Sequence, residues 1–446
     1  MKLSFIDVTS ALTSDGYGGA SVVIKNIVPR LTRYFEVDYI PSLRSIISMG
    51  GEDQKARLLS TLDSVKEYGL NVPDAVLKFL EDMSPWENPK RRIELYLSAT
   101  TKPAERPDYY FDADYWFYNL SPPLLRPLIF SPPHYDLLLG DVYALARRSG
   151  RKAIVLLQGV GTRYSSFPGH IPLQYLRSAG MEGANVKDLL KWEGYEIAHY
   201  VYSRALKGQI FKGVLGMSKG ALANAGLADC EKCKALRVGA AFDAELLGLR
   251  NASKDNYALF FGRLVTNKGV LELPRIYKRM RNATQADMVI AGKFFDRQTE
   301  KAFNQQLKKL DVKDGIKLTG WLPIRDLYET IARAKVLLYP SHSDSFSLVI
   351  LQSLAAGTPV VAYDIPGPRS VFSGLPAVKF VKEFDWKAMA DEAVKIMRMR
   401  DEDYYNMIND EEVMKFLKDH SSWDDAAEEV ANIIMELAER RYGTEA

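Results

Sequence analysis

Residues 257–292 read YALFFGRLVTNKGVLELPRIYKRMRNATQADMVIAG, and this stretch decides the fold class. It opens with a short apolar run at 258–261 and closes with a second one at 288–291, and both have the length and composition of buried strands. Between them, apolar side chains recur at the spacing of one helix face: Val270, Leu273, Tyr277 and Met280. A strand, a helix and a second strand in this order predict a parallel βαβ unit.

The same alternation continues toward the end of the chain. Four more short apolar runs follow, at residues 316–318, 336–339, 360–362 and 378–380. Strands that alternate with helical segments predict a parallel sheet with helices on both faces. A last amphipathic segment, roughly residues 423–440, is predicted to be a helix that braces this domain.

The first half of the chain shows a weaker version of this pattern. A strand is predicted at residues 2–8, followed by a glycine loop, SDGYGG, and a helix through Ala20 and Leu31. Further strands are predicted at 35–40, 135–139, 153–157 and 213–217. Residues 45–130 are rich in helix formers, charges and aromatic residues and have no strand rhythm, so we interpret them as a helical insertion.

The 446 residues exceed what one hydrophobic core usually organises, so two domains of roughly 200 residues are expected. We place them at 1–242 and 243–446. The predicted fold class is α/β, with two Rossmann-like, doubly wound domains that face each other. In such sheets, ligands bind at the carboxyl ends of the strands.

Composition excludes some classes of protein. The 59 Lys and Arg residues nearly balance the 56 Asp and Glu residues, so nothing demands nucleic acid as a partner. No run of about 18 apolar residues occurs, and the first residues lack the layout of a signal peptide, which together predict a cytoplasmic protein. The two cysteines, Cys230 and Cys233, lack the further ligands of a zinc site and are interpreted as surface thiols or a local disulfide.

Two cations mark the loop after the predicted strand 258–261. Arg263 follows Gly262, and Lys268 lies five residues further on. A guanidinium grips two anionic oxygens at once, an ammonium acts as a point charge, and a following helix N-terminus adds partial positive charge. The loop therefore predicts a site for a diphosphate, with a pair of solvated loop cations as the alternative.

A second polar loop follows the strand at 336–339. It contains Asp344, placed to accept hydrogen bonds from sugar hydroxyls, and Ser345, after which a helix is predicted to begin. The free N–H groups of that helix start would point at an anion. They belong to Phe346, Ser347, Leu348 and Val349. Asp344 and Ser345 are equally typical of helix N-caps, and the two roles are compatible.

Residues 257–440 resemble the donor-binding half of the family 4 retaining glycosyltransferases, which have the GT-B fold. The resemblance rests on the Gly-Arg-Leu loop with Lys268, and on the frame DSFSLVILQS at 344–353, followed by AAGTPVVA. It implies that Arg263 and Lys268 hold the diphosphate of a nucleotide sugar and that Asp344 meets the transferred sugar. It also implies that the loop with Trp321 and Leu322 borders the base, with simple packing of Trp321 as the alternative.

The sequence departs from this family at several positions. Gln352 stands where the family has a glutamate that meets the ribose, and Ser345 and Ser347 replace two glycines. Gln158 occupies the loop where many relatives place a histidine near the reacting carbon. Gly18 and Gly19 match the glycine loop expected to approach the donor phosphates.

The resemblance implies a metal-independent enzyme that transfers a sugar from a nucleoside diphosphate sugar to an acceptor hydroxyl, with retention of anomeric configuration. The acceptor could be a sugar, a lipid-linked molecule or a protein, and peripheral membrane contact is a secondary hypothesis. Asp112 and Asp114 form a D-x-D pair that resembles the metal motif of another glycosyltransferase fold, a match short enough to arise by chance. The alternatives are a non-catalytic sugar-nucleotide-binding or scaffold protein, and a nucleotide-sugar epimerase or phosphorylase. Among the five histidines, His342 is the best candidate for a role in the site.

Overall fold

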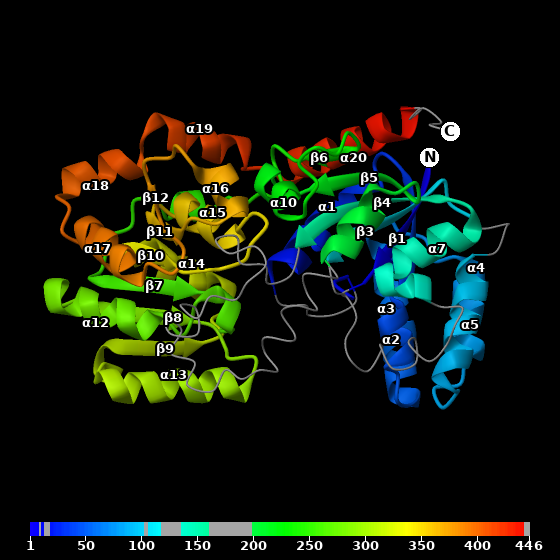
Figure 1. The fold of residues 1–446 in the computed structure, drawn as a ribbon, viewed down its shortest axis with the longest axis horizontal. Coiled ribbons are helices and arrows are strands. Elements are labelled where there is room, and N and C mark those ends of the chain that lie inside the picture. The colour runs from blue at the N-terminus through cyan, green and yellow to red at the C-terminus, as the bar shows by residue number, and fades with distance from the viewer. Residues whose placement is uncertain (9, 13–17, 102–105, 117–134, 160–198, 441–446) are drawn as a thin grey trace. The chain divides into compact units, whose positions relative to one another are not determined.

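The computed structural model describes the chain except for residues 9, 13–17, 102–105, 117–134, 160–198 and 441–446 (Figure 1). The described residues form two compact units, and each is considered by itself. The N-terminal unit contains residues up to 159, residues 199–239 and the chain from Trp423 onward, while the C-terminal unit contains Ala240–Ser422. Among the described helices, none has the length and apolar character needed to span a membrane.

The C-terminal unit is built on a six-stranded sheet in which every neighbouring pair is parallel. The strand order is β12-β11-β10-β7-β8-β9, so β7 lies beside β10 in the middle. The strands are β7 (Tyr257–Phe261), β8 (Asp287–Ala291), β9 (Ile316–Gly320), β10 (Val336–Tyr339), β11 (Val360–Tyr363) and β12 (Val378–Val381). The sequence predicted all six, because each is a short apolar run.

Helices cover both faces of this sheet. On one face α12 packs against α13 and α17, and on the other α15 packs against α11, α14 and α19. The helices are α11 (Glu245–Gly248), α12 (Leu273–Thr284), α13 (Arg297–Leu310), α14 (Ile324–Arg333), α15 (Leu348–Ala355), α16 (Pro366–Phe372), α17 (Trp386–Met397), α18 (Asp401–Ile408) and α19 (Glu411–Asp419). The predicted apolar stripe of α12 is buried in the main core of this unit, as the helical spacing requires.

The N-terminal unit also has a parallel six-stranded sheet, in the order β2-β1-β3-β4-β5-β6. Its strands are β1 (Lys2–Asp7), β2 (Glu36–Pro41), β3 (Tyr109–Trp116), β4 (Lys152–Gly159), β5 (Phe211–Gly216) and β6 (Cys233–Ala235). Its main helices are α1 (Gly19–Leu31), α7 (Asp141–Ser149), α10 (Lys219–Asn224) and α20 (Trp423–Glu439). Both units are therefore doubly wound α/β domains, as predicted.

The segment interpreted as a helical insertion contains four helices that precede β3. They are α2 (Leu43–Ile47), α3 (Glu52–Glu67), α4 (Asp74–Asp82) and α5 (Pro89–Thr100). Arg92 of α5 is buried and donates hydrogen bonds to backbone carbonyls that include those of Ile46, Met49 and Pro85. One guanidinium thus satisfies backbone carbonyl groups that would otherwise cost free energy to bury.

Three expectations from the sequence were wrong, two in the N-terminal half and one at the end of the chain. Strand β3 lies within the region that showed no strand rhythm, because two aspartates, Asp112 and Asp114, occupy buried positions in it. The predicted strand at Tyr135–Leu139 is a 3-10 helix, since a five-residue apolar run fits either structure.

The third correction concerns the final helix. Helix α20 packs on α1 and β5 and so belongs to the N-terminal unit, not to the C-terminal domain that we had assigned to residues 243–446. Gly213 of β5 permits this packing, because a Cβ there would lie 2.2 Å from Cδ1 of Leu437. Glu429 adds a polar link by accepting hydrogen bonds from the backbone N–H groups of Arg237 and Val238.

Cys230 and Cys233 form a disulfide bond in the turn that leads into β6. The local disulfide was one of the two states that the sequence allowed. Among the described residues, no group of three or more histidine, cysteine or acidic side chains is arranged to hold a metal ion.

Candidate active site

The strand order of the C-terminal unit creates a crevice position between β7 and β10. From β7 the chain winds outward through β8 and β9, then returns to β10 and winds the other way through β11 and β12. The loops after β7 and β10 therefore leave the sheet in opposite directions. In open α/β sheets, ligands bind at this switch point, beyond the carboxyl ends of the strands.

The loop after β7 carries the two predicted cations. It runs from Gly262 through Arg263 to a short 3-10 helix, Thr266–Lys268, that ends at Gly269. Gly269 has a φ of 73°, and a Cβ there would lie 2.0 Å from the carbonyl oxygen of Pro340 in the neighbouring loop. The turn can therefore approach the loop after β10 only because this residue is glycine.

Lys268 forms an ion pair with Asp344 across the switch point. Its Nζ lies 2.8 Å from Oδ2 of Asp344 and also donates to the carbonyl oxygen of Ser343, at 3.0 Å. The hydroxyl of Tyr339 donates to the same Asp344 oxygen. Burial opposes ionisation of Asp344, but Lys268 and the hydrogen bonds outweigh it and hold the pKa of Asp344 below its ordinary value.

The two cations differ in their surroundings. The side chain of Lys268 is only 19% exposed, which argues against the alternative of two solvated loop cations for this residue. Arg263 is half-buried, and its guanidinium lies over the ring of Phe295, 5.9 Å from the centroid. No carboxylate in the described part of the chain pairs with Arg263, so its charge is available to an anionic ligand.

The helix after β10 begins at Leu348, two residues later than predicted. Its N-cap is Ser347, whose hydroxyl accepts a hydrogen bond from the N–H of Ile350. Ser347 has a φ of 95°, a backbone conformation that favours glycine. Asp344 is therefore not the cap; its Oδ1 accepts from the N–H of Phe346 at 3.4 Å.

The loop after β10 is also held by packing against α16 and against His420. The side chain of Phe346 is buried against Phe372 and His420, while Ser345 is 9% exposed. Gly367 of α16 lies directly against the loop, because a Cβ there would stand 2.2 Å from the carbonyl oxygen of Asp344. The main chain of the loop after β10, which contains Asp344, is thus fixed by contacts that the sequence did not reveal.

The remaining predicted donor residues belong to the same unit. Trp321 and Leu322 follow β9, at the same edge of the sheet as Arg263, and the side chain of Trp321 is 39% exposed. Gln352 lies on the second turn of α15 and is half-buried. This unit therefore brings Lys268 and Asp344 together, with Arg263 in the same loop as Lys268 and Trp321 along the same edge of the sheet.

Gly18, Gly19 and Gln158 are residues of the N-terminal unit. Gly18 is the N-cap of α1, with a φ of 148°, and Gly19 is the first residue of that helix. Gln158 lies near the end of β4, and its Nε2 donates to the carbonyl oxygen of Ala113 on β3 at 3.2 Å. Val160 and Gly161, which follow it, lie outside the described residues.

Three residues near the cations form a buried network that sequence reasoning largely missed. His342 lies between Glu272 and Glu383, and all three side chains are at most 3% exposed. His342 had been singled out by its position, but its two partners are 70 and 41 residues away in the chain. Pairings at such separations leave no local signal in the sequence.

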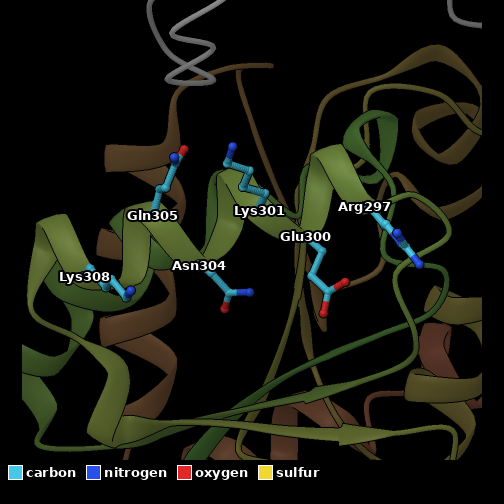
Figure 2. A pocket seen from close by; sticks show the side chains of 6 residues that line it. All are labelled: Arg297, Glu300, Lys301, Asn304, Gln305 and Lys308. Atoms are coloured by element: carbon cyan, nitrogen blue, oxygen red, sulfur yellow. The ribbon is translucent and has the colours of Figure 1, made fainter.

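A separate hollow of about 510 Å³ lies along α13 (Figure 2). Its lining residues are Arg297, Glu300, Lys301, Asn304, Gln305 and Lys308. All six come from one helix, and none belongs to the loops after β7 and β10. The hollow therefore has no part in the site at the switch point.

Comparison with known proteins identifies a matching family for part of the C-terminal unit. Residues 248–414 match the model of the family described as glycosyl transferases group 1. A 2-deoxystreptamine N-acetyl-D-glucosaminyltransferase of Niallia circulans is 24% identical over 38% of this chain and 40% of its own length. A D-inositol 3-phosphate glycosyltransferase of Acidothermus cellulolyticus is 35% identical over 24% of this chain and 26% of its own length. The matched stretch thus spans two fifths or less of these two relatives.

Solved structures extend the likeness in fold to almost the whole chain. HepE of Anabaena, in complex with UDP and glucose, has a TM-score of 0.63 at 14% identity and covers 98% of this chain and 99% of its own. Sucrose-phosphate synthase of Thermosynechococcus elongatus has a TM-score of 0.61 at 13% identity, over 98% of this chain and 99% of its own. The chain therefore has the GT-B fold, and residues 248–414 within its C-terminal unit match the glycosyl transferases group 1 family.

Proposed function

We propose that this protein transfers a sugar from a nucleoside diphosphate sugar to an acceptor hydroxyl, with retention of anomeric configuration. The observation that carries the proposal is the constellation of Arg263, Lys268 and Asp344 at the switch point between β7 and β10. It combines two cations for a diphosphate with one carboxylate for sugar hydroxyls. The family of the C-terminal unit supports the same reading.

The hydrogen-bond count of Lys268 leaves room for a phosphate. An ammonium has three N–H donors, and the structure uses one on Asp344 and one on Ser343. The third can reach a diphosphate oxygen without breaking the ion pair. Arg263 adds the bidentate geometry that a phosphate prefers.

These two cations would also speed the reaction. Breaking the bond between the sugar and the diphosphate builds negative charge on the leaving oxygen. Cations held in place before the reaction stabilise that charge in the transition state at no reorganisation cost. In this proposal Arg263 and Lys268 carry out the charge neutralisation that a divalent metal provides in other enzymes.

The other residues receive roles around this centre. Asp344 accepts hydrogen bonds from hydroxyls of the transferred sugar, with the Ser345, Phe346, Ser347 and Leu348 backbone beside it. Gln352 hydrogen-bonds the ribose, and Trp321 and Leu322 border the base. In the N-terminal unit, Gly18 and Gly19 approach the phosphates and Gln158 orients groups near the reacting carbon.

One observation favours a second function. Gln352 is an amide where the family resemblance implies a glutamate, and an uncharged acceptor binds a ribose hydroxyl less strongly. A protein of this fold that binds sugar nucleotides without turnover would tolerate that change. The experiment below separates the two functions.

A panel of nucleotide sugars with candidate acceptors tests the proposal directly. Purified protein should release the nucleoside diphosphate from at least one donor, with EDTA leaving the rate unchanged, and NMR of the product should show the donor's anomeric configuration. Tight binding with no release would support the non-catalytic alternative. Interconversion of the donor sugar would instead indicate an epimerase. Loss of turnover in EDTA, restored by magnesium or manganese, would contradict the role given to the two cations.

A further inference from the structure

The buried network of Glu272, His342 and Glu383 lies directly behind the proposed diphosphate site. We infer that His342 is a positioning residue, which holds the turn of Lys268 and the loop of Asp344 in register for donor binding and transfer. The inference rests on the proposed function of this site. It assigns a task to three residues that do not themselves touch the donor in that proposal.

Both ring nitrogens of His342 face carboxylates. Nε2 lies 2.6 Å from Oε1 of Glu272, and Nδ1 lies 3.0 Å from Oε1 of Glu383. A carboxylate only accepts, so both nitrogens must donate, and the ring that does so is an imidazolium. With the histidine 2% exposed, these two hydrogen bonds are shielded from competing water.

The three residues come from three separate parts of the unit. Glu272 immediately precedes α12, His342 follows β10, and Glu383 lies between β12 and α17. Phe384 stacks on the imidazole at 4.4 Å, and the hydroxyl of Tyr363 on β11 donates to Glu272. The network therefore ties the loop after β10 to elements on either side of it.

The main chain of the same residues connects to the proposed site. The N–H of His342 donates to the carbonyl oxygen of Asn267 at 2.9 Å, and Asn267 directly precedes Lys268. Asp344 lies two residues after His342. The N–H of Glu272 donates to the carbonyl oxygen of Gly269 at 3.0 Å, and Gly269 directly follows Lys268. A shift of the imidazole would thus move both partners of the Lys268–Asp344 pair.

The charges of the network explain how it can fix one arrangement of the two loops over others. Burial alone would lower the pKa of His342, but Glu272 and Glu383 outweigh it and raise the pKa to about 9. The titratable groups that face the ring are these two glutamates and Tyr363, while Asp344 lies on the same loop as His342 and is paired with Lys268 of the loop after β7. Buried ion networks add little net stability, and their best-attested use is to fix one arrangement over others.

The pH dependence follows from the direction of this shift. Because the pKa is raised in the folded state, the contribution of the imidazolium is complete below about 6.5 and is lost as the pH rises through about 9. Above that pH, two buried carboxylates face each other across a neutral ring. At that pH, the loops of Lys268 and Asp344 should be held less firmly in their relative position.

The test compares His342→Gln and Glu383→Gln with Ile276→Val, a control that removes one buried methylene from α12 and leaves the three side chains of the network unchanged. The probes are UDP for binding and the best donor from the panel for turnover. A displacement of about 1 Å can cost on the order of 100-fold in rate, so His342→Gln should lower kcat by roughly 10- to 100-fold. The control should keep kcat even where its melting temperature falls.

Glu383→Gln supplies a readout that a purely structural role would not move. Removing one carboxylate lowers the pKa of His342, so the fall of kcat at alkaline pH should begin at a lower pH than in the wild type. Carbon-13 labelling of the five histidines, with His342→Gln to assign its signal, should show the same displacement in the titration. An unchanged alkaline limb would overturn the inference.

The two proposals fail in different ways. If wild-type protein neither binds UDP nor turns over any donor, the proposed function is wrong. If the wild type binds and turns over while His342→Gln matches it in kcat, KM and UDP affinity, only the positioning role is wrong. Equal loss in His342→Gln and Ile276→Val at equal loss of stability would also reduce the network to a structural role and so overturn the inference.

Discussion

Lys268 and Asp344 neutralise each other in the structure, and this pairing determines how each can act on a ligand. Among the described residues, Lys268 retains one N–H donor for a phosphate, while Asp344 retains the lone pairs that Lys268, Tyr339 and the N–H of Phe346 do not use. The sequence indicated both residues but not their bond, because 76 positions separate them. Ser347 was likewise predicted only as a donor of an N–H group, whereas its side chain caps α15.

The Asp344→Asn variant separates handling of the sugar from handling of the diphosphate. Asparagine removes the negative charge that competes with a phosphate for Lys268, and it weakens the acceptor for sugar hydroxyls. We expect UDP affinity to stay equal or rise, while kcat for the nucleotide sugar falls roughly 10- to 100-fold, the equivalent of about 1.5 to 3 kcal/mol. Calorimetry with UDP and steady-state kinetics measure the two effects. A wild-type kcat would remove Asp344 from the sugar subsite.

At the scale of elements, one glycine allows the loop after β7 to pack closely on the loop after β10, and a second allows α16 to pack closely on that same loop. Gly269 meets Pro340, and Gly367 meets the backbone of Asp344 and Ser345. Such contacts place the main chain of a site more firmly than side-chain packing does, because backbone atoms have little freedom to yield.

Gly367→Ala should displace the loop after β10, which contains Asp344. Its Cβ would stand 2.2 Å from the carbonyl oxygen of Asp344, closer than atoms can approach, so the backbone must shift. Overpacking of this kind costs about 1 to 3 kcal/mol, and we expect a lower melting temperature together with a large loss of turnover. Gly248→Ala in α11 is the matched control, since its Cβ would meet nothing within 4 Å. Full turnover by the Gly367 variant would show that the loop tolerates the shift.

Helices and strands were predictable where the buried positions are occupied by apolar residues. The six strands of the C-terminal unit are apolar runs between helical segments, so the sequence located each of them. Strand β3 was not found, because Asp112 and Asp114 are buried polar residues in a strand interior. The short apolar run at 135–139 was predicted to be a strand but forms a 3-10 helix. In both cases tertiary packing overrides the local pattern.

At the scale of the whole molecule, the N-terminal unit contains buried acids, two in its sheet and one at the start of α7, whose protonation couples to folding. Burial is the main cause that raises the pKa of Asp112 well above its ordinary value, and it raises the pKa values of Asp7 and Asp141 to about 6. A raised pKa in the folded state means that the stabilising contribution is present below about 3.8 and is lost as the pH rises.

Stability should therefore fall as the pH rises from about 4 to 6, and Asp112→Asn should reduce the slope. A group that stays protonated in the folded state and ionises on unfolding contributes about 1.4 kcal/mol per pH unit. Asparagine removes that contribution. Urea unfolding at several pH values gives the slopes of both proteins. An equal slope for the variant would show that Asp112 ionises in the folded protein.

The two-unit organisation was predictable from length and pattern, but the assignment of α20 was not. Its amphipathic spacing shows that one face must be buried, without indicating which unit buries it. The answer depends on Gly213, Glu429 and the ion pair between Arg30 and Asp424, which connect residues far apart in the chain. Gln158 was expected in the loop after a strand but lies within β4, and Gly18 is the N-cap of α1; their roles in transfer stay predictions.

The most direct test of the account measures UDP binding to wild-type protein, Arg263→Ala, Lys268→Ala and the control Lys301→Ala, which removes an exposed cation from α13. Each site cation should make at least one charge-assisted hydrogen bond to the diphosphate. Its loss should therefore weaken binding about 10- to 100-fold, while Lys301→Ala should bind as the wild type does. Arg263→Ala should keep its melting temperature, whereas Lys268→Ala should lower it, because Asp344 loses its partner. Wild-type affinity for UDP in both site variants would contradict the assignment of these cations to the diphosphate.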